Sequence, residues 1–172
     1  DLDLGVLSGS PAATDNLLIV GDATAGLAHL GGQRLNVQLA LLDPPYNTLS
    51  RFHHYKDSQK RSLWLAEREE HACSIRDMLA MTGSLWMHLD DSELHSCKLL
   101  LDTVFGRANY VGTVVWQKSL SRENRTGLST SHEYLLVYAK DKRRWAKHRN
   151  PLPASPEQLR RYANEDGDPR GP

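Results

Sequence analysis

The feature that most constrains this fold is a mostly apolar run, Val37 to Leu42, that ends directly before Asp43-Pro44-Pro45-Tyr46. A run of this kind predicts a buried parallel strand. The strand must end at the two prolines, because neither can donate a hydrogen bond to a neighbouring strand. Asp43 therefore stands at the carboxyl end of a strand, where open α/β sheets bind their ligands. The pattern predicts an α/β fold with a candidate site at this edge.

The same strand end combines a carboxylate with an aromatic ring on a stiff backbone. The ring of Tyr46 can stack on a flat molecule while the carboxylate of Asp43 accepts a hydrogen bond from an amino group of that molecule. The structural alternative is an Asx-type turn followed by a proline turn. The residues by themselves leave both interpretations open.

The quartet Asp43, Pro44, Pro45 and Tyr46 after an apolar strand resembles motif IV of the amino-methyltransferases that act on DNA bases. These enzymes move a methyl group from S-adenosylmethionine to adenine N6 or cytosine N4. The resemblance implies that the four residues are catalytic and that S-adenosylmethionine is the cofactor. Because Asp rather than Ser heads the motif, we expect an adenine N6 methyltransferase. The alternatives are a cytosine N4 enzyme and a non-catalytic nucleic-acid-binding relative.

The resemblance also implies a mechanism. The Asp43 carboxylate and the Pro44 carbonyl accept the two N–H groups of the adenine amine, so that its lone pair can attack the methyl group, and Tyr46 stacks on the base. The base must leave the duplex to reach such a site. No metal is expected, because His53 and His54 in the polar loop 47–61 lack a second ligand pair at zinc spacing.

Two further elements precede the central strand. Leu17 to Val20 reads as a short buried strand, Gly21-Asp22 as its end, and Ala23 to Leu30 as a helix closed by two glycines. With the Val37–Leu42 strand they form a predicted βαβ unit. Taken alone, Gly21-Asp22 is a turn and a helix N-cap. By resemblance, the cofactor-binding residues are Gly21, Asp22 and Asp43.

The rest of the chain predicts more helices and strands. A helix is expected over 62–82 with Gly83 as its stop, a strand over 84–89, and a capping box from Asp90 to Glu93 that opens a helix ending near Phe105. Strands are expected over 110–116 and 132–140, with a loop between them. These two resemble motifs VII and VIII, an antiparallel pair at one side of the sheet.

Charge is distributed unevenly along a chain whose net charge is zero. Residues 107–150 hold ten Lys and Arg against three acidic residues, a local net charge of +7. This segment predicts contacts with DNA phosphates, and the alternative is a solvated face. The DNA-binding residues that we expect are Lys118, Arg122 and Arg125 in the loop and, continuing the run, Lys142, Arg143 and Arg144.

The predicted fold class is a Rossmann-like, mostly parallel sheet with flanking helices and an antiparallel pair of late strands. Its 172 residues are enough for one domain, and two cysteines without metal spacing indicate reduced thiols. We expect a flexible N-terminus over 1–15, the catalytic half of a methyltransferase domain over 16–140 (motifs IV to VIII), and the start of a target-recognition or linker region over 141–172.

That domain is expected to be partial. In the permuted beta class of the family, the Asp-Pro-Pro-Tyr half comes first and a Phe-x-Gly-x-Gly half comes last, and the sequence contains no Phe-x-Gly-x-Gly. The similarity is to modification subunits of type III restriction-modification systems. It implies a restriction-modification or phage-defence role, double-stranded DNA, a homodimer or the remainder of a longer chain, a restriction subunit as partner, and a bacterial or archaeal cytoplasm without membrane attachment. An unrelated nucleotide-binding domain is disfavoured, since Gly-x-Gly-x-x-Gly and Walker patterns are missing from the sequence.

Overall fold

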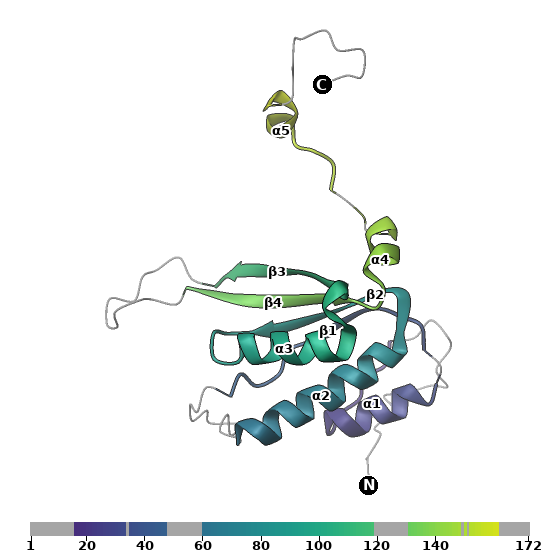
Figure 1. The fold of residues 1–172 in the computed structure, drawn as a ribbon. Helices are drawn as coiled ribbons and strands as arrows, with labels where there is room; N and C mark the ends of the chain where they lie inside the picture. The colour runs from purple at the N-terminus through teal and green to yellow at the C-terminus, as the bar shows by residue number, and fades with distance from the viewer. Residues whose placement is uncertain are drawn as a thin grey trace, which may run out of the picture.

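The computed structural model describes residues 16–33, 35–47, 60–118, 131–148, 150 and 152–161. Helices and strands alternate along the first half of the chain, and two strands follow one another in the second half (Figure 1). The elements in order are α1 (Ala23–Gly31), β1 (Val37–Leu42), α2 (Arg61–Met78), β2 (Leu79–Leu89), α3 (Leu94–Phe105), the 3₁₀ turn η1 (Arg107–Asn109), β3 (Tyr110–Gln117), β4 (His132–Ala139), α4 (Lys142–His148) and α5 (Pro156–Arg161).

The four strands form one sheet in the order β1-β2-β4-β3. β1 and β2 are parallel and are joined through α2, whereas β4 is antiparallel to both β2 and β3. The predicted α/β class and the antiparallel pair of late strands are therefore confirmed. Over the described residues the sheet is mixed, with one parallel pairing and two antiparallel ones.

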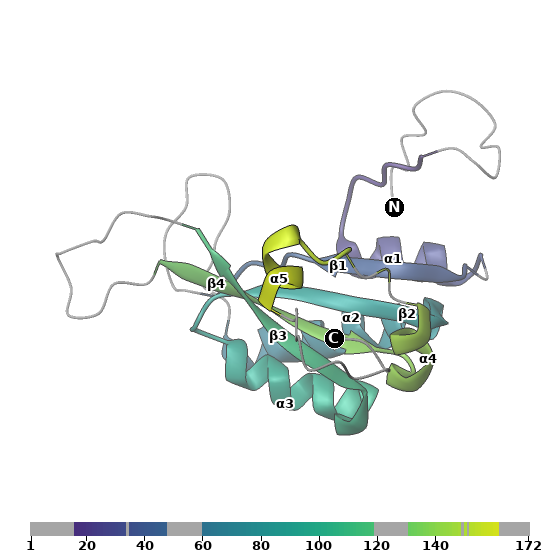
Figure 2. The same cartoon turned by 90° about the horizontal axis from the view of Figure 1, so that it is seen from above.

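Three helices lie on one face of this sheet. Figure 1 shows α1, α2 and α3 together below the strands, and Figure 2 shows the sheet from above. The core forms between these helices and alternate residues of the strands, because successive side chains of a strand point to opposite faces. Its most buried members are Trp64, Ala72, Leu85, Met87, Leu89, Cys97, Leu101, Leu136 and Tyr138.

The central strand is only partly buried. β1 matches its predicted bounds, and Val37, Ala40 and Leu42 pack against the core. Leu39 and Leu41, however, are 59% and 66% exposed, because they alternate with Ala40 and Leu42 and so point to the face of the sheet away from the core. The expectation of a strand buried on both faces is wrong for the described part of the chain, because α1, α2 and α3 all lie on the same face of the sheet (Figure 1).

The predicted strand over Leu17–Val20 is also wrong. Residues 16–20 form no strand, and Leu17, Leu18 and Val20 are more than half exposed. A strand needs a neighbour for its backbone hydrogen bonds, and β1 pairs only with β2 in the described sheet. The predicted helix that follows is confirmed, since Asp22 caps α1 by accepting a hydrogen bond from the Ala25 N–H at 3.2 Å.

The boundary between α2 and β2 differs from the prediction. α2 ends at Met78, and Gly83 lies inside β2 rather than at a helix end. The apolar residues at 79–81 continued the helical pattern, which made the helix look longer. Gly83 instead permits a close approach of backbones, since a Cβ there would lie 2.5 Å from the Val37 carbonyl oxygen. The register of β1 on β2 is irregular at this point.

The predicted capping box before α3 is not formed. Asp90 accepts hydrogen bonds from the Ser92 N–H at 2.9 Å and the Ser92 hydroxyl at 3.1 Å, an Asx turn. Glu93 is the N-cap residue but caps nothing with its side chain. It forms an ion pair with Arg61 at 3.0 Å, because α2 packs beside α3 and brings this opposite charge within reach.

Candidate active site at the carboxyl ends of the strands

The predicted turn stands where β1 ends. Asp43 directly follows β1, Pro44 is buried, and the Pro45 carbonyl accepts a hydrogen bond from the Trp64 indole at 2.8 Å. Asn47 closes the turn in the left-handed region, with φ of 57°, and is itself buried. The buried Trp64 of α2 thus anchors the turn from the core side, while the Asp43 side chain remains 68% exposed.

A histidine of the neighbouring strand faces this turn. Because Leu42 pairs with Met87 in the parallel register, the next residues along both strands, Asp43 and His88, lie side by side. His88 Nδ1 lies 3.1 Å from the Tyr46 hydroxyl and 3.5 Å from Asp43 Oδ1. The rings of Tyr46 and His88 meet edge to face at 5.6 Å between centroids.

A second carboxylate lies on the other side of His88. The Nε2 atom is 3.1 Å from Glu133 Oε2, a charge contact that lacks the alignment of a hydrogen bond. The other oxygen of Glu133 accepts a hydrogen bond from Lys118 Nζ at 2.9 Å. Lys118 follows β3 and Glu133 belongs to β4, so all four strands of the sheet contribute to the site. We call Asp43, Tyr46, His88, Glu133 and Lys118 the polar row.

The sequence reasoning missed His88 and Glu133. His88 was counted only as part of a strand, and Glu133 only as an acidic residue in a basic segment. One signal was present: His88 is a lone titratable residue in an otherwise apolar strand end, immediately before Leu89-Asp90-Asp91. For Glu133 no local signal existed, because its role depends on the pairing of β2 with β4.

Electrostatics keep the Tyr46 hydroxyl protonated. Burial raises the pKa of Tyr46 well above its usual value, and the negative charges of Asp43 and Glu133 raise this pKa further. The hydroxyl is therefore a hydrogen-bond donor over the whole physiological pH range. It lies close to the Asp43 carboxylate, which can accept a hydrogen bond from it, and to His88 Nδ1. Tyr46 can orient groups in the site but cannot serve as an anionic base.

Two of the three predicted cofactor residues, Gly21 and Asp22, lie at the start of α1, and the third, Asp43, follows β1. Gly21 has φ of 151°, a conformation that a residue with a Cβ rarely adopts, and Asp22 is exposed beyond its capping bond. Behind them, Thr24 and His71 are joined by a side-chain hydrogen bond of 2.9 Å. Burial lowers the pKa of His71, and the nearby Arg68 lowers it further, so His71 is a neutral link between α1 and α2.

The expected DNA-binding residues do not form one continuous run. Lys118 lies in the polar row, and Arg122 and Arg125 lie outside the described residues. Lys142, Arg143 and Arg144 begin α4 at the opposite end of β4, which spans about 26 Å. Lys142 Nζ donates to the Tyr110 carbonyl at 2.7 Å, and Arg144 pairs with Asp141 at 3.4 Å. The length of β4 thus separates Lys118 from Lys142, Arg143 and Arg144, although all four belong to one basic segment of the sequence.

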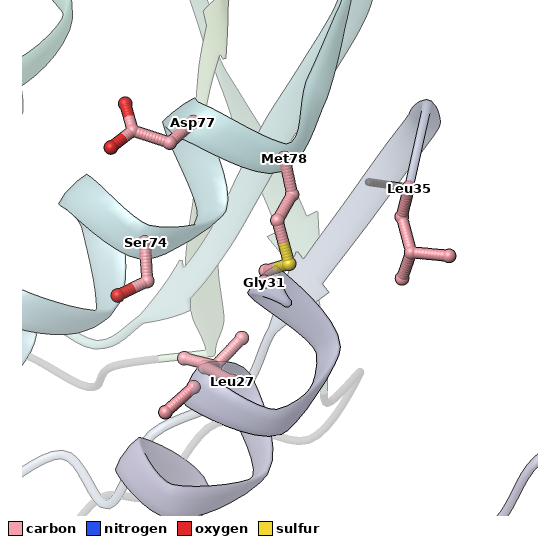
Figure 3. A pocket seen from close by; sticks show the side chains of 7 residues that line it. Leu27, Gly31, Leu35, Ser74, Asp77 and Met78 are labelled. Atoms are coloured by element: carbon pink, nitrogen blue, oxygen red, sulfur yellow. The ribbon is translucent and has the colours of Figure 1, made fainter. Parts of the chain in front are cut away.

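A shallow cavity of about 310 Å³ lies elsewhere, between the ends of α1 and α2 (Figure 3). Leu35, which precedes β1, is part of its wall, so the cavity lies at the amino end of β1 and away from Asp43. It is not part of the polar row. Its lining consists of Leu27, Ala28, Gly31, Leu35, Ser74, Asp77 and Met78.

Metal-binding clusters and membrane-spanning helices are both missing from the described residues. Among the described residues, no group of three or more His, Cys, Asp and Glu side chains could hold a metal ion. Within the same part of the chain, none of the helices combines the length and apolar character that crossing a membrane requires.

Solved structures show the class of fold. TTHA0409 of Thermus thermophilus, described as a DNA modification methylase and solved with S-adenosyl-L-methionine, superposes with a TM-score of 0.52. It is 19% identical, and the match covers 84% of this chain and 58% of that one. The M1.HpyAVI–SAM complex superposes with a TM-score of 0.50 at 15% identity. That match covers 70% of this chain and 53% of the other. The described sheet and helices therefore have a methyltransferase fold.

The sequence comparisons identify the family. The DNA methylase model N6_N4_Mtase matches residues 37–171, and the chain belongs to this family. The HindVI Mod subunit of Haemophilus influenzae, described as a probable type III restriction-modification enzyme, is 31% identical over 142 residues. That match covers 79% of this chain and 19% of the relative. The predicted similarity to type III modification subunits is confirmed.

Two other relatives extend the comparison. The EcoP15I Mod subunit of Escherichia coli is 27% identical over 160 residues, which cover 75% of this chain and 25% of the relative. The type II methyltransferase M.KpnI of Klebsiella pneumoniae is 28% identical over 139 residues, which cover 74% of this chain and 33% of the relative. The matches therefore span between 19% and 33% of the length of these relatives.

Proposed function

We propose that this chain carries the catalytic motif of a DNA methyltransferase that methylates the exocyclic N6 amine of adenine. The observation that carries the proposal is the placement of Asp43 beside Tyr46 on an anchored turn, at the carboxyl ends of the strands, in a member of the DNA methylase family. An exposed carboxylate beside a half-buried ring suits a flat molecule that bears an amino group.

Adenine N6 is a poor nucleophile, because its lone pair is delocalised into the ring. The Asp43 carboxylate and the Pro44 carbonyl accept its two N–H bonds and favour a pyramidal nitrogen whose lone pair is free. The methylated amine loses its proton after attack, so no strong base is needed beforehand. The protonated Tyr46 stacks on the base, which has left the duplex. Positioning by these residues supplies much of the rate.

The cofactor is S-adenosylmethionine, which supplies a methyl group made electrophilic by its positively charged sulfonium. Asp22 offers an exposed carboxylate next to a glycine turn at the start of α1, an acceptor that fits the hydroxyl and amino groups of a nucleoside. We assign Gly21, Asp22 and Asp43 to the cofactor side of the site. The remaining contacts belong to the Phe-x-Gly-x-Gly half of the enzyme.

Double-stranded DNA is the substrate in this proposal. Lys118, Arg122 and Arg125 contact phosphates beside the target base, since Lys118 belongs to the polar row. Lys142, Arg143 and Arg144 contact phosphates further along the duplex. The length of β4, about 26 Å, corresponds to roughly eight base pairs.

The enzyme is larger than this chain. β1 has a free edge in the described sheet, and its exposed Leu39 and Leu41 favour coverage by another part of the protein. We assign residues 16–140 to the catalytic half and 141–172 to the start of the target-recognition region. The type III relatives support a restriction-modification role in a prokaryotic cytoplasm, with a restriction subunit and a second modification subunit as partners.

A methylation assay with the complete enzyme tests the proposal directly. Incubation with labelled S-adenosylmethionine and unmethylated DNA should yield N6-methyladenine, identified by mass spectrometry of the nucleosides. N4-methylcytosine as the sole product would reject the adenine assignment, and no methyl transfer would favour a non-catalytic DNA-binding relative.

Asp43→Ala is the matched variant in the same assay. It should lower the single-turnover rate roughly 100- to 1,000-fold, the cost of losing one group that stabilises a transition state. Its melting temperature should not change, because the Asp43 side chain is 68% exposed. Wild-type turnover in this variant would remove Asp43 from the mechanism.

A further inference from the structure

We infer that His88 is a positioning residue that fixes the Asp43 carboxylate and the Tyr46 hydroxyl for catalysis. The inference rests on the proposed function and deepens it, because it concerns the same site. His88 does not need to touch the substrate: it acts through the two residues that do. His88 lies in the polar row between Asp43, which is exposed, and Glu133, which is largely buried.

The orientation of the Asp43 carboxylate has to be fixed by another residue. Its side chain is 68% exposed and follows the end of an edge strand, so few contacts hold its carboxylate in one orientation. Among the described residues, the only positively chargeable group within 4 Å of this carboxylate is His88 Nδ1, at 3.5 Å from Oδ1. A contact to Oδ1 leaves Oδ2 for the amine of the base.

The Tyr46 hydroxyl is held from the same atom. It lies 3.1 Å from His88 Nδ1 and also interacts with Asp43. The rings of Tyr46 and His88 meet edge to face, with an interplanar angle of 76°, so they do not form a parallel stack. His88 can therefore fix the tilt of the Tyr46 ring while a base stacks on that ring.

The other ring nitrogen of His88, Nε2, contacts a residue that orients the ring. Nε2 lies 3.1 Å from the Glu133 carboxylate, which is 14% exposed and is held in turn by Lys118 at 2.9 Å. The negative charge of Glu133 near Nε2 favours a proton on that nitrogen without forming a hydrogen bond to it, which leaves Nδ1 to accept from the Tyr46 hydroxyl in the neutral ring. When both nitrogens carry protons, Nδ1 donates toward Asp43 instead. In either state one nitrogen faces Glu133 and the other faces the catalytic pair.

This geometry permits a test in which the two ring nitrogens are replaced separately. In the complete enzyme, His88→Asn keeps a polar group near the Nδ1 position, and His88→Gln keeps one near the Nε2 position. His88→Leu keeps neither. His95→Leu is the matched control, because His95 is exposed on α3. The readouts are kcat, KM for duplex DNA, the melting temperature, and the fluorescence of 2-aminopurine at the target base, which reports base flipping.

We expect His88→Gln and His88→Leu to lower kcat roughly 100-fold, the effect of a misplaced reacting group. KM, base flipping and the melting temperature should stay close to wild type, and His88→Asn should recover most of kcat. His95→Leu should match wild type in every readout.

Three results would overturn the inference while leaving the proposed function in place. They are an active enzyme in which His88→Leu keeps full kcat, a higher KM with unchanged kcat, and equal losses in all three variants together with a lower melting temperature. The last would show a structural role only. A wild-type enzyme that transfers no methyl group would instead overturn the proposed function itself.

Discussion

At the scale of single residues, the site depends on a tyrosine whose ring and hydroxyl have separate surroundings. The hydroxyl of Tyr46 faces His88 Nδ1, and its pKa is raised by burial and by the charges of Asp43 and Glu133. The ring is half-buried on the proline turn. We therefore assign the ring to base stacking and the hydroxyl to a secondary, orienting role.

Substitutions at Tyr46 should separate these two roles. Tyr46→Ala should cost about 1–3 kcal/mol of base binding, the usual contribution of one stacked base. Tyr46→Phe keeps the ring and loses one hydrogen bond, so it should retain most activity, with a loss of about 0.5–1.5 kcal/mol at most. The measurement is kcat/KM for both variants. Equal losses would assign the main role to the hydroxyl.

At the scale of the elements, the site depends on how β1 pairs with β2. Their parallel register brings His88 beside Asp43, and a one-residue slip would turn His88 to the opposite face of the sheet. The irregular start of this pairing lies at Gly83, where the Val37 carbonyl passes too close for any side chain. Gly83 thus lets the two strands reach the register that the site requires.

Gly83→Ala should destabilise the fold. The added Cβ would lie 2.5 Å from the Val37 carbonyl oxygen, and the backbone shift needed to relieve this contact should cost about 1–3 kcal/mol. Gly112→Ala in β3 is the control, because a Cβ at Gly112 meets nothing within 4 Å. Thermal denaturation of both variants provides the measurement. Equal melting temperatures would mean that β1 adjusts without strain.

At the scale of the whole molecule, basic residues lie at both ends of the sheet. Lys118 is in the polar row, whereas Arg143 is exposed on α4, beyond the other end of β4. Figure 1 shows α4 at one end of the β3–β4 pair, and β3 ends and β4 begins at the other. A duplex that contacts both groups must extend along the strands.

Salt dependence of DNA binding tests this arrangement. Neutralising Arg122 and Arg125 together should weaken cognate and non-cognate binding alike and lower the slope of log affinity against log salt by roughly 1 per lost contact. Arg143→Gln, on α4 at the other end of the sheet, should likewise weaken binding to both kinds of DNA and lower the salt slope. Arg107→Gln, exposed in η1, is the control. A loss confined to cognate DNA would indicate base readout, and no change would indicate a solvated surface.

The sequence by itself determined most elements and the Asp43–Tyr46 turn. Apolar runs and glycine or proline stops placed α1, β1, β3 and β4 within a residue or two, because those signals are local. The Asp43–Tyr46 turn was likewise readable, since two prolines must end a strand wherever it packs. The boundary at Met78 was missed because apolar residues continue the helical pattern into β2.

Only the tertiary structure decided which side chains meet. His88 and Glu133 are 45 residues apart in sequence, and they come into contact because β2 and β4 pair in a particular register. The pairing of β3 with β4 keeps Lys118 beside the start of β4, whereas the length of β4 places Lys142 at the opposite end of the sheet, although both lysines belong to one basic segment. Register depends on long-range packing of the whole sheet, which local residue patterns do not encode.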